Sequence, residues 1–268
     1  MARLLAMAPR LDVEQAAALA DACRRAGALE DAERLIERLR QQASAAPEAA
    51  LRLGEALQGR DLLRASTAAG PTPIVRRKDF LPPELHAQIL EDLQRCLDEF
   101  VASPLLAGDQ EIYAADRRRS LTRRALGAYR AELEQHLQTL LLDIPDVAAL
   151  MNDPAVRLDL HCQVHGDGDF FGVHSDAEAG RWGQRLVSLV YYLHSRPRRF
   201  SGGDLLIYDR RIGGDTYNES AFTRVIPDDN SLVVFPATAV HEVERLQMPD
   251  APLAHGRFTI VGALLAKS

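Results

Sequence analysis

Apolar and polar positions follow a helical period over residues 11–66, which are rich in Ala and Leu and carry many Arg and Glu side chains. Asp12 is a good N-cap for a first helix, and Gly27 separates that helix from a second one at about Leu29–Gln42. The pattern ends in the Gly and Pro residues of the segment 70–73, where we expect a boundary.

Residues 71–150 are expected to support a sheet with helices. A short strand is expected at 74–80, followed by a long amphipathic helix over 82–101 that begins with two prolines. An irregular segment at 103–120, of the kind that forms lids, precedes a second long helix at about 125–142.

After Pro145 the pattern changes to short apolar runs that are separated by Gly, Pro and Asp turns, with no helical period between them. Such a pattern predicts a β-sandwich or barrel, and a jelly roll (double-stranded β-helix) fits it well. The predicted fold class is therefore α+β, with helices first and a jelly-roll core at 151–268. The expected strands are 157–164, 170–176, 185–193, 203–208, 222–226, 231–235, 241–246 and 257–266.

Composition excludes several classes of protein. The chain has 268 residues and a formal net charge of −6, so no nucleic-acid partner is expected. No apolar stretch approaches the ~20 residues of a membrane span, and the run Leu4–Ala8 is too short for a secretory signal. The three cysteines lack Cys-x-x-Cys spacing, which favours isolated thiols in a cytoplasmic protein without membrane association.

Three residues of the β region can form a metal site. His174 and Asp176 are two positions apart, and side chains at i and i+2 of a strand point to the same face. His241, after the apolar strand 232–235 and its turn, supplies a third ligand. Two histidines and one carboxylate leave three open coordination positions, as in non-haem Fe(II) oxygenases. The alternative is two core histidines and a turn aspartate.

A second pair of residues suits a carboxylate. Arg257 and Thr259 are again two positions apart on the last expected strand, so a guanidinium and a hydroxyl would point the same way. Arginine binds a carboxylate with two parallel hydrogen bonds and keeps its charge when buried. Tyr192, in the strand 185–193, can add a phenolic donor.

Taken together, these motifs resemble the Fe(II)/2-oxoglutarate-dependent dioxygenases of the prolyl-4-hydroxylase type, over residues 72–268. The similar stretches are 168–176, 185–193, 202–205, 235–243 and 256–259.

The resemblance implies that His174, Asp176 and His241 bind Fe(II) and that these three, with Arg257, are the catalytic residues. It also implies that Arg257, Thr259 and Tyr192 bind 2-oxoglutarate, that O2 is the second cosubstrate, and that ascorbate can act as a supporting reductant.

The implied reaction is hydroxylation of an unactivated C–H bond, with release of succinate and CO2. The expected substrate is an amino acid that is free, part of a peptide or bound to a carrier. One alternative keeps the cofactors but ends in desaturation, epoxidation or cyclisation. Another is a non-catalytic, cupin-like metal-binding module.

The chain departs from the family pattern at two places. His165 stands nine residues before the first ligand, where family members often have a tyrosine, and 247–254 is an insertion before Arg257. Near the expected mouth of the site, Arg185 is a candidate substrate contact. The run 117–119 is expected to be solvated charge, with contact to an acidic substrate or a carrier protein as the alternative.

Residues 1–70 lie outside this resemblance and are expected to form a separate helical extension, next to a dioxygenase domain at 71–268. Leu19, Ala20 and Cys23 recur 34 residues later as Leu53, Gly54 and Leu57, which resembles a partial tetratricopeptide repeat. About three repeats are needed for a continuous core, so a cap packed on its neighbour is the favoured interpretation. Docking of a protein partner, or self-association through these helices, is the alternative.

Overall fold

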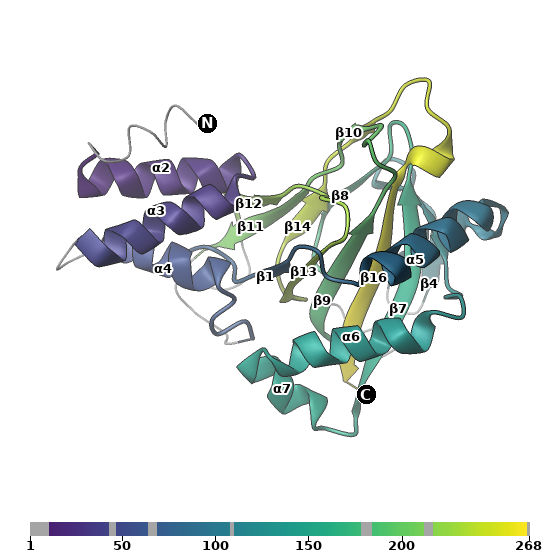
Figure 1. The fold of residues 1–268 in the computed structure, drawn as a ribbon, viewed down its shortest axis with the longest axis horizontal. Helices are drawn as coiled ribbons and strands as arrows, with labels where there is room; N and C mark the ends of the chain where they lie inside the picture. The colour runs from purple at the N-terminus through teal and green to yellow at the C-terminus, as the bar shows by residue number, and fades with distance from the viewer. Residues whose placement is uncertain are drawn as a thin grey trace.

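The computed structural model describes residues 11–42, 47–63, 69–107, 110–177, 184–211 and 217–266. The start of the chain, with the run Leu4–Ala8, and the turns predicted at Gly183 and Gly213–Gly214 lie outside these residues. Among the described residues, every helix is too short or too polar to cross a lipid bilayer. The fold combines helices with antiparallel sheets, and the helices come first along the chain (Figure 1).

The N-terminal helices are α2 (Val13–Arg25), α3 (Leu29–Gln42) and α4 (Glu48–Leu57). Asp12 caps α2 as expected, because its carboxylate accepts from the backbone N–H of Gln15 and the Gln15 side chain accepts from the N–H of Asp12. Gly27 has φ = +79°, the left-handed conformation that commonly ends a helix.

The remaining helices are α5 (Pro83–Arg95), η2 (Leu97–Glu99), α6 (Arg130–Leu142), α7 (Pro145–Met151) and η3 (Leu253–His255). Helix α5 is shorter than the expected 82–101, because the chain leaves the helical conformation at Cys96. The segment 103–120, expected to be irregular, contains the short strand Leu105–Ala107, which pairs with Gln110–Ile112, and the strand Arg118–Arg119 at the edge of a sheet. Local pairing of this kind leaves little periodicity in the sequence.

Seven strands form the larger antiparallel sheet among the described residues. Its expected strands end within two residues of the observed ones, except at the short edge strand β1. In spatial order they are β1 (Val75–Arg77), β13 (Ser231–Pro236), β9 (Gln184–Leu193), β16 (Arg257–Ala266), β7 (Val156–His165), β6 (Leu121–Arg123) and β2 (Val101–Ala102).

The smaller sheet of the described chain has five strands and carries both histidines of the expected metal site. Two further strand pairs stand apart, β10 (Ser201–Gly202) with β15 (Leu246–Gln247) and β3 (Leu105–Ala107) with β4 (Gln110–Ile112). The five strands are, in spatial order, β12 (Tyr217–Val225), β11 (Leu205–Arg210), β14 (His241–Val243), β8 (Phe170–His174) and β5 (Arg118–Arg119).

The two faces of the seven-stranded sheet differ in chemistry because its sequence alternates. In β16, Phe258 and Ile260 join the apolar cluster that includes residues of α5, α6 and α7, and these helices cover that face (Figure 1). Arg257 and Thr259 alternate with them and therefore point to the opposite, inner face. The register of β7 places His165 opposite Arg257, so the inner face is polar at this end.

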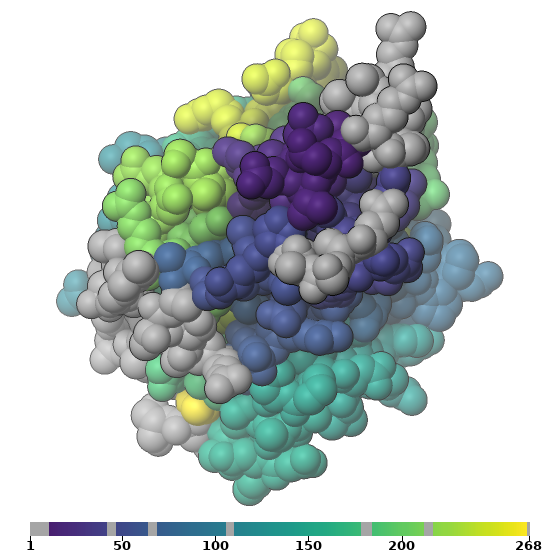
Figure 2. Space-filling view, turned by 90° about the vertical axis from the view of Figure 1, so that its left-hand side faces the viewer, coloured from purple at the N-terminus to yellow at the C-terminus, as the bar shows by residue number. Residues whose placement is uncertain are grey.

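Helices α2, α3 and α4 pack against the other end of the sheets. Cys23 and Ile36 from these helices share one apolar cluster with Phe235 of β13 and Ile207 of β11. In Figure 2 these helices, purple to blue, lie together in the middle of this face, with later segments visible around them. The tetratricopeptide resemblance itself stays a prediction.

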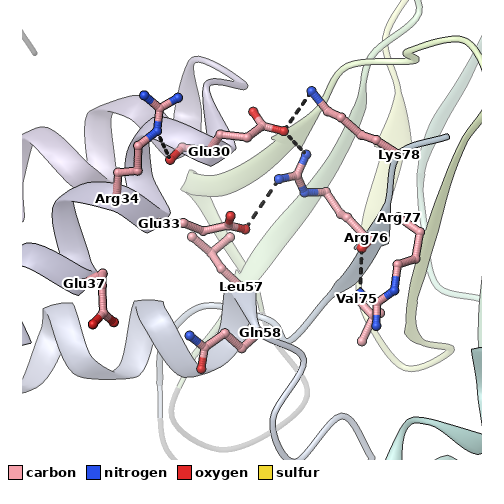
Figure 3. Close-up of a pocket in the computed structure, with 10 residues that line it drawn as sticks. All are labelled: Glu30, Glu33, Arg34, Glu37, Leu57, Gln58, Val75, Arg76, Arg77 and Lys78. Carbon is pink, nitrogen blue, oxygen red and sulfur yellow. Dashed lines mark hydrogen bonds and ion pairs between the residues drawn. The ribbon is translucent and has the colours of Figure 1, made fainter. Parts of the chain in front are cut away.

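Charged residues line a cleft where α3 meets β1 (Figure 3). Glu30 reaches both Lys78, at 2.8 Å, and Arg76, at 3.3 Å, while Glu33 lies 3.4 Å from Arg76. These ion pairs tie the helices to the edge strand of the larger sheet.

Candidate metal and cosubstrate site

The two expected histidine ligands lie on neighbouring strands. His241 of β14 is the register partner of His174 of β8, and their ring centroids are 4.1 Å apart. Asp176 follows β8 in a turn, and its backbone N–H donates to the carbonyl of Ala237 at 3.0 Å. The turn between β13 and β14 therefore positions the carboxylate beside both imidazoles.

The ligand atoms of His174, Asp176 and His241 all lie within 4.8 Å of one another. The Nε2 atom of His174 is 3.8 Å from Oδ1 of Asp176, and that of His241 is 3.7 Å from Oδ2. These separations are too long for hydrogen bonds. They suit three groups that bind one metal ion between them.

Backbone carbonyls orient both imidazole rings. Nδ1 of His174 lies 2.8 Å from the carbonyl oxygen of Gly172, and Nδ1 of His241 lies 2.9 Å from that of Ala239. A carbonyl can only accept, so each Nδ1 carries the proton and each Nε2 presents its lone pair to the site. This arrangement is common for metal-bound histidines.

The charge state of the site also favours a metal. Burial and the neighbouring His241 lower the pKa of His174, so its ring is neutral near pH 7. Burial opposes ionisation of Asp176, but His241, His174 and Arg185 together hold its pKa below the usual range. Ser188 donates a 2.7 Å hydrogen bond to Oδ2 of Asp176 and fixes its orientation.

Arg257 is buried on the inner face with 2% of its surface exposed. Its Cζ atom lies 4.9 Å from the centroid of the Tyr192 ring, and none of the described acidic side chains is close enough for an ion pair. Gly203, at φ = +70°, leaves the space that Arg257 needs, since a Cβ there would lie 3.1 Å from its Cδ. A buried charge without a counter-ion is costly, which indicates that an anion binds here.

Four polar atoms of this inner face have no hydrogen-bond partner among the described residues. They are Nε of Arg257, Oη of Tyr192, Oγ1 of Thr259 and Nε2 of His165. Burial raises the pKa of Tyr192 to about 12, so its hydroxyl is protonated and can donate. Buried polar groups in native proteins are almost always paired, so this cluster lacks a ligand with several acceptor atoms.

The tautomer of His165 follows from its neighbour. Nη1 of Arg257 lies 3.3 Å from Nδ1 of His165, and a guanidinium can only donate, so Nδ1 is the acceptor. Burial and the charge of Arg257 lower the pKa of His165 well below its usual value, so the ring is neutral. Its one proton is therefore on Nε2, the atom without a partner.

The structure thus brings together all the residues that the sequence singled out, in two groups. One is the triad of His174, Asp176 and His241, and the other contains Arg257, Thr259 and Tyr192. Arg185 lies beside the triad, with Nη1 at 3.5 Å from Oδ1 of Asp176.

Sequence reasoning missed Ser188 as the residue that orients Asp176. His161, Gln163 and His165 occupy alternate positions of β7 and therefore share the inner face. That alternation is visible in the sequence.

Comparison with known proteins agrees with this geometry. Residues 160–263 match the model of the 2OG-Fe(II) oxygenase superfamily. This segment of the chain is similar to the 2OG-Fe(II) oxygenase superfamily. It spans β7 to β16 and includes every residue of both groups.

A hydroxylase of known sequence is also similar to this chain. An uncharacterised PKHD-type hydroxylase of Synechocystis is 26% identical over 193 residues, which cover 71% of this chain. The chain spans only 62% of that relative.

Two solved structures share the fold. A Pseudomonas putida prolyl-4-hydroxylase superposes with a TM-score of 0.52 at 19% identity, over 74% of this chain and 94% of that one. A prolyl hydroxylase from Trichoplax adhaerens, in complex with a peptide fragment of hypoxia inducible factor, gives 0.51 at 16% identity, over 72% and 83%.

The described residues fit both the metal ion and the cosubstrate that the name of the matching superfamily implies. Two imidazoles and a carboxylate suit Fe(II), which accepts nitrogen and oxygen ligands together. The unpaired guanidinium with its orphaned donors suits a carboxylate of 2-oxoglutarate.

Proposed function

We propose that the protein hydroxylates an unactivated C–H bond of an amino acid or amino-acid residue. In this reaction one atom of O2 enters the new hydroxyl group, the other enters succinate, and 2-oxoglutarate loses CO2. The proposal rests on two features that occur together. Three side chains are placed to bind one metal ion, and a buried arginine has no counter-ion among the described residues.

His174, Asp176 and His241 would hold Fe(II), which when bound supplies O2 activation coupled to decarboxylation of 2-oxoglutarate. Arg257 would anchor the far carboxylate of the cosubstrate through its guanidinium. The neutral ring of His165 would donate to the same ligand from Nε2, in place of the tyrosine often found in the family.

Tyr192 and Thr259 would complete the carboxylate site with hydroxyl donors. Beyond them, Val190, Val233 and Phe235 belong to an apolar cluster. This apolar wall would exclude water from the bound cosubstrate and strengthen its ionic contacts.

We also propose that residues 71–268 carry the reaction and that residues 1–70 form a cap on them. The apolar cluster that α2, α3 and α4 share with the sheets favours such a packing role over partner docking.

The test is an anaerobic titration with Fe(II) and 2-oxoglutarate, followed by visible absorption. The proposal predicts a charge-transfer band from the chelated cosubstrate, which His241→Ala abolishes. His255→Ala is a matched control, because His255 bonds to Ser195 and is outside both groups. Absence of the band in the wild-type protein, or its persistence in His241→Ala, contradicts the proposal.

A second measurement identifies the outcome of the reaction. With O2 present, candidate amino acids and peptides are incubated with the protein, and succinate release and product mass are followed. Gain of one oxygen atom supports hydroxylation, whereas loss of two hydrogen atoms would indicate desaturation or ring closure instead.

A further inference from the structure

Arg118 forms a stack with one of the metal-site histidines. Its Cζ atom lies 4.5 Å from the centroid of the Phe171 ring, and Phe171 in turn stacks on His174 with ring centroids 3.6 Å apart. Arg118 is the register partner of Phe171 on β5 and β8. The guanidinium is therefore one aromatic ring away from a metal-site histidine.

Two hydrogen bonds hold the guanidinium of Arg118 in place, and both are made to neutral groups. Its Nε donates to Oγ of Ser120 at 3.1 Å, and Nη1 donates to the carbonyl of Pro104 at 2.9 Å. Both partners are neutral, and among the described acidic side chains none forms an ion pair with Arg118. Burial lowers the pKa of Arg118 to about 10, which still leaves it charged at neutral pH.

A second cation stands on the same side. Arg185, at the start of β9, points Nη1 toward Asp176 at 3.5 Å and remains 31% exposed. Burial, and then the charges of Arg118 and Arg185, lower the pKa of His161 to about 3, which places this neutral ring within the field of both. Its Nε2 lies 2.8 Å from Nε2 of Gln163.

Beside the metal triad, the described arginines outnumber the described acidic groups. Among the described residues, the acidic group that lies close to both Arg118 and Arg185 is Asp176, which belongs to the metal triad. A dication on the triad would more than cancel that carboxylate. Among the same residues, the two guanidinium groups would then lack a counter-ion, a condition that favours an anionic ligand.

We propose that Arg118 and Arg185 bind the α-carboxylate of the substrate, so that the substrate is a free or N-acylated amino acid. This proposal rests on the proposed function and narrows its substrate class. Nη2 of Arg118 supplies a donor, and Arg185 can turn from Asp176 to the incoming carboxylate. A neutral residue in the middle of a peptide would leave both cations unpaired.

The test compares matched probes under anaerobic conditions, with Fe(II) and 2-oxoglutarate bound to the full chain. Each N-acetyl amino acid is titrated beside its own amide by calorimetry, across the common side chains. The acid and the amide have the same shape and differ by one charge. We expect at least one acid to bind about tenfold more tightly than its amide, as charge-assisted hydrogen bonds imply.

Arg118→Gln should reduce that preference to about threefold or less, and Arg118→Lys should keep part of it. Arg119→Gln is the matched control, because the neighbouring Arg119 is 48% exposed and pairs with Asp169 instead. This control should leave the preference unchanged.

Three results would overturn the proposal: amides that bind as tightly as acids, no acid with a Kd below about 10 mM, or a preference that survives in Arg118→Gln. The charge-transfer band is recorded in the same samples. Its absence in the wild-type protein refutes the proposed function and this inference together, whereas a band without acid preference refutes the inference alone.

Discussion

Arg24 and Arg257 are both buried to 2% exposure, yet their surroundings are opposite. Arg24, on α2, donates to Oδ1 of Asp209 at 2.5 Å and to Oδ2 at 3.0 Å, and it also pairs with Asp21. Arg257, on β16, has a neutral histidine and an aromatic ring beside it.

The pKa values of the two arginines move in opposite directions because Arg24 has carboxylate partners and Arg257 has none among the described residues. Burial disfavours both charges, but Asp209 and Asp21 more than compensate and raise the pKa of Arg24. At Arg257 burial prevails and lowers the pKa. A buried arginine with carboxylate partners has its charge compensated within the fold, whereas one without them indicates a binding site for an anion.

The largest expected effect is on cosubstrate binding. Arg257→Met should weaken 2-oxoglutarate binding about a hundredfold or more, because it removes the cation that pairs with a buried carboxylate. The urea midpoint should stay the same or rise, since an unpaired buried charge is gone. Calorimetry and urea unfolding measure the two effects. A large loss of stability with intact 2-oxoglutarate binding would show that Arg257 stabilises the fold and does not bind the cosubstrate.

Arg24→Met should show the opposite pattern. Leaving Asp209 buried without its partner is expected to cost about 3–5 kcal/mol of unfolding free energy, with little change in 2-oxoglutarate affinity. The double variant Arg24→Met/Asp209→Leu should recover most of that loss. Arg25→Ala is the control, because Arg25 is 44% exposed and its ion pair with Asp21 is worth at most about 1 kcal/mol.

Substitutions at two adjacent residues of β16 should separate stability from 2-oxoglutarate binding with smaller effects. Ile260→Val, on the apolar face, should cost about 0.5–1.5 kcal/mol of stability and leave 2-oxoglutarate binding unchanged. Thr259→Val, on the polar face, should weaken 2-oxoglutarate binding by about fivefold, since it removes one hydroxyl donor. Equal effects of both substitutions on both measurements would show that the two faces are not functionally distinct.

The smallest expected effect is a pH dependence of stability at the cleft between α3 and β1. Burial opposes ionisation of Glu30, but Lys78 and Arg76 lower its pKa to about 2, from 4.5 (Figure 3). Its contribution is therefore complete above pH 4.5 and lost as the pH falls toward 2.

Glu30→Gln should thus unfold at lower urea than the wild type at pH 6, and the difference should shrink steadily as the pH falls from 4.5 toward 2. Added salt should shrink the difference, because Glu30 is 41% exposed. Glu84→Gln, at an exposed position of α5, should show no such trend. A difference that grows toward low pH would contradict the assignment.

The sequence predicted most of the sheet because alternation has a simple physical origin. In β16 the order Arg257, Phe258, Thr259, Ile260 places charge on one face and apolar groups on the other, and the structure has this arrangement. The register of His174 opposite His241 could not be read from the sequence, since strand pairing depends on contacts across 67 residues.

Other features depend on tertiary contacts that leave no local pattern. The role of Ser188 as donor to Asp176 comes from two strands that meet in space, and so does the stack of Arg118 on Phe171. The Arg24–Asp209 pair joins residues 185 positions apart. It therefore could not be anticipated from the helical period of α2.

The most direct test of the account is a crystal structure grown anaerobically with Fe(II) and 2-oxoglutarate. The account predicts one metal ion bound by Nε2 of His174, Nε2 of His241 and a carboxylate oxygen of Asp176. It also predicts the far carboxylate of 2-oxoglutarate on the guanidinium of Arg257. Metal at another place, or a cosubstrate carboxylate that leaves Arg257 unpaired, would contradict it.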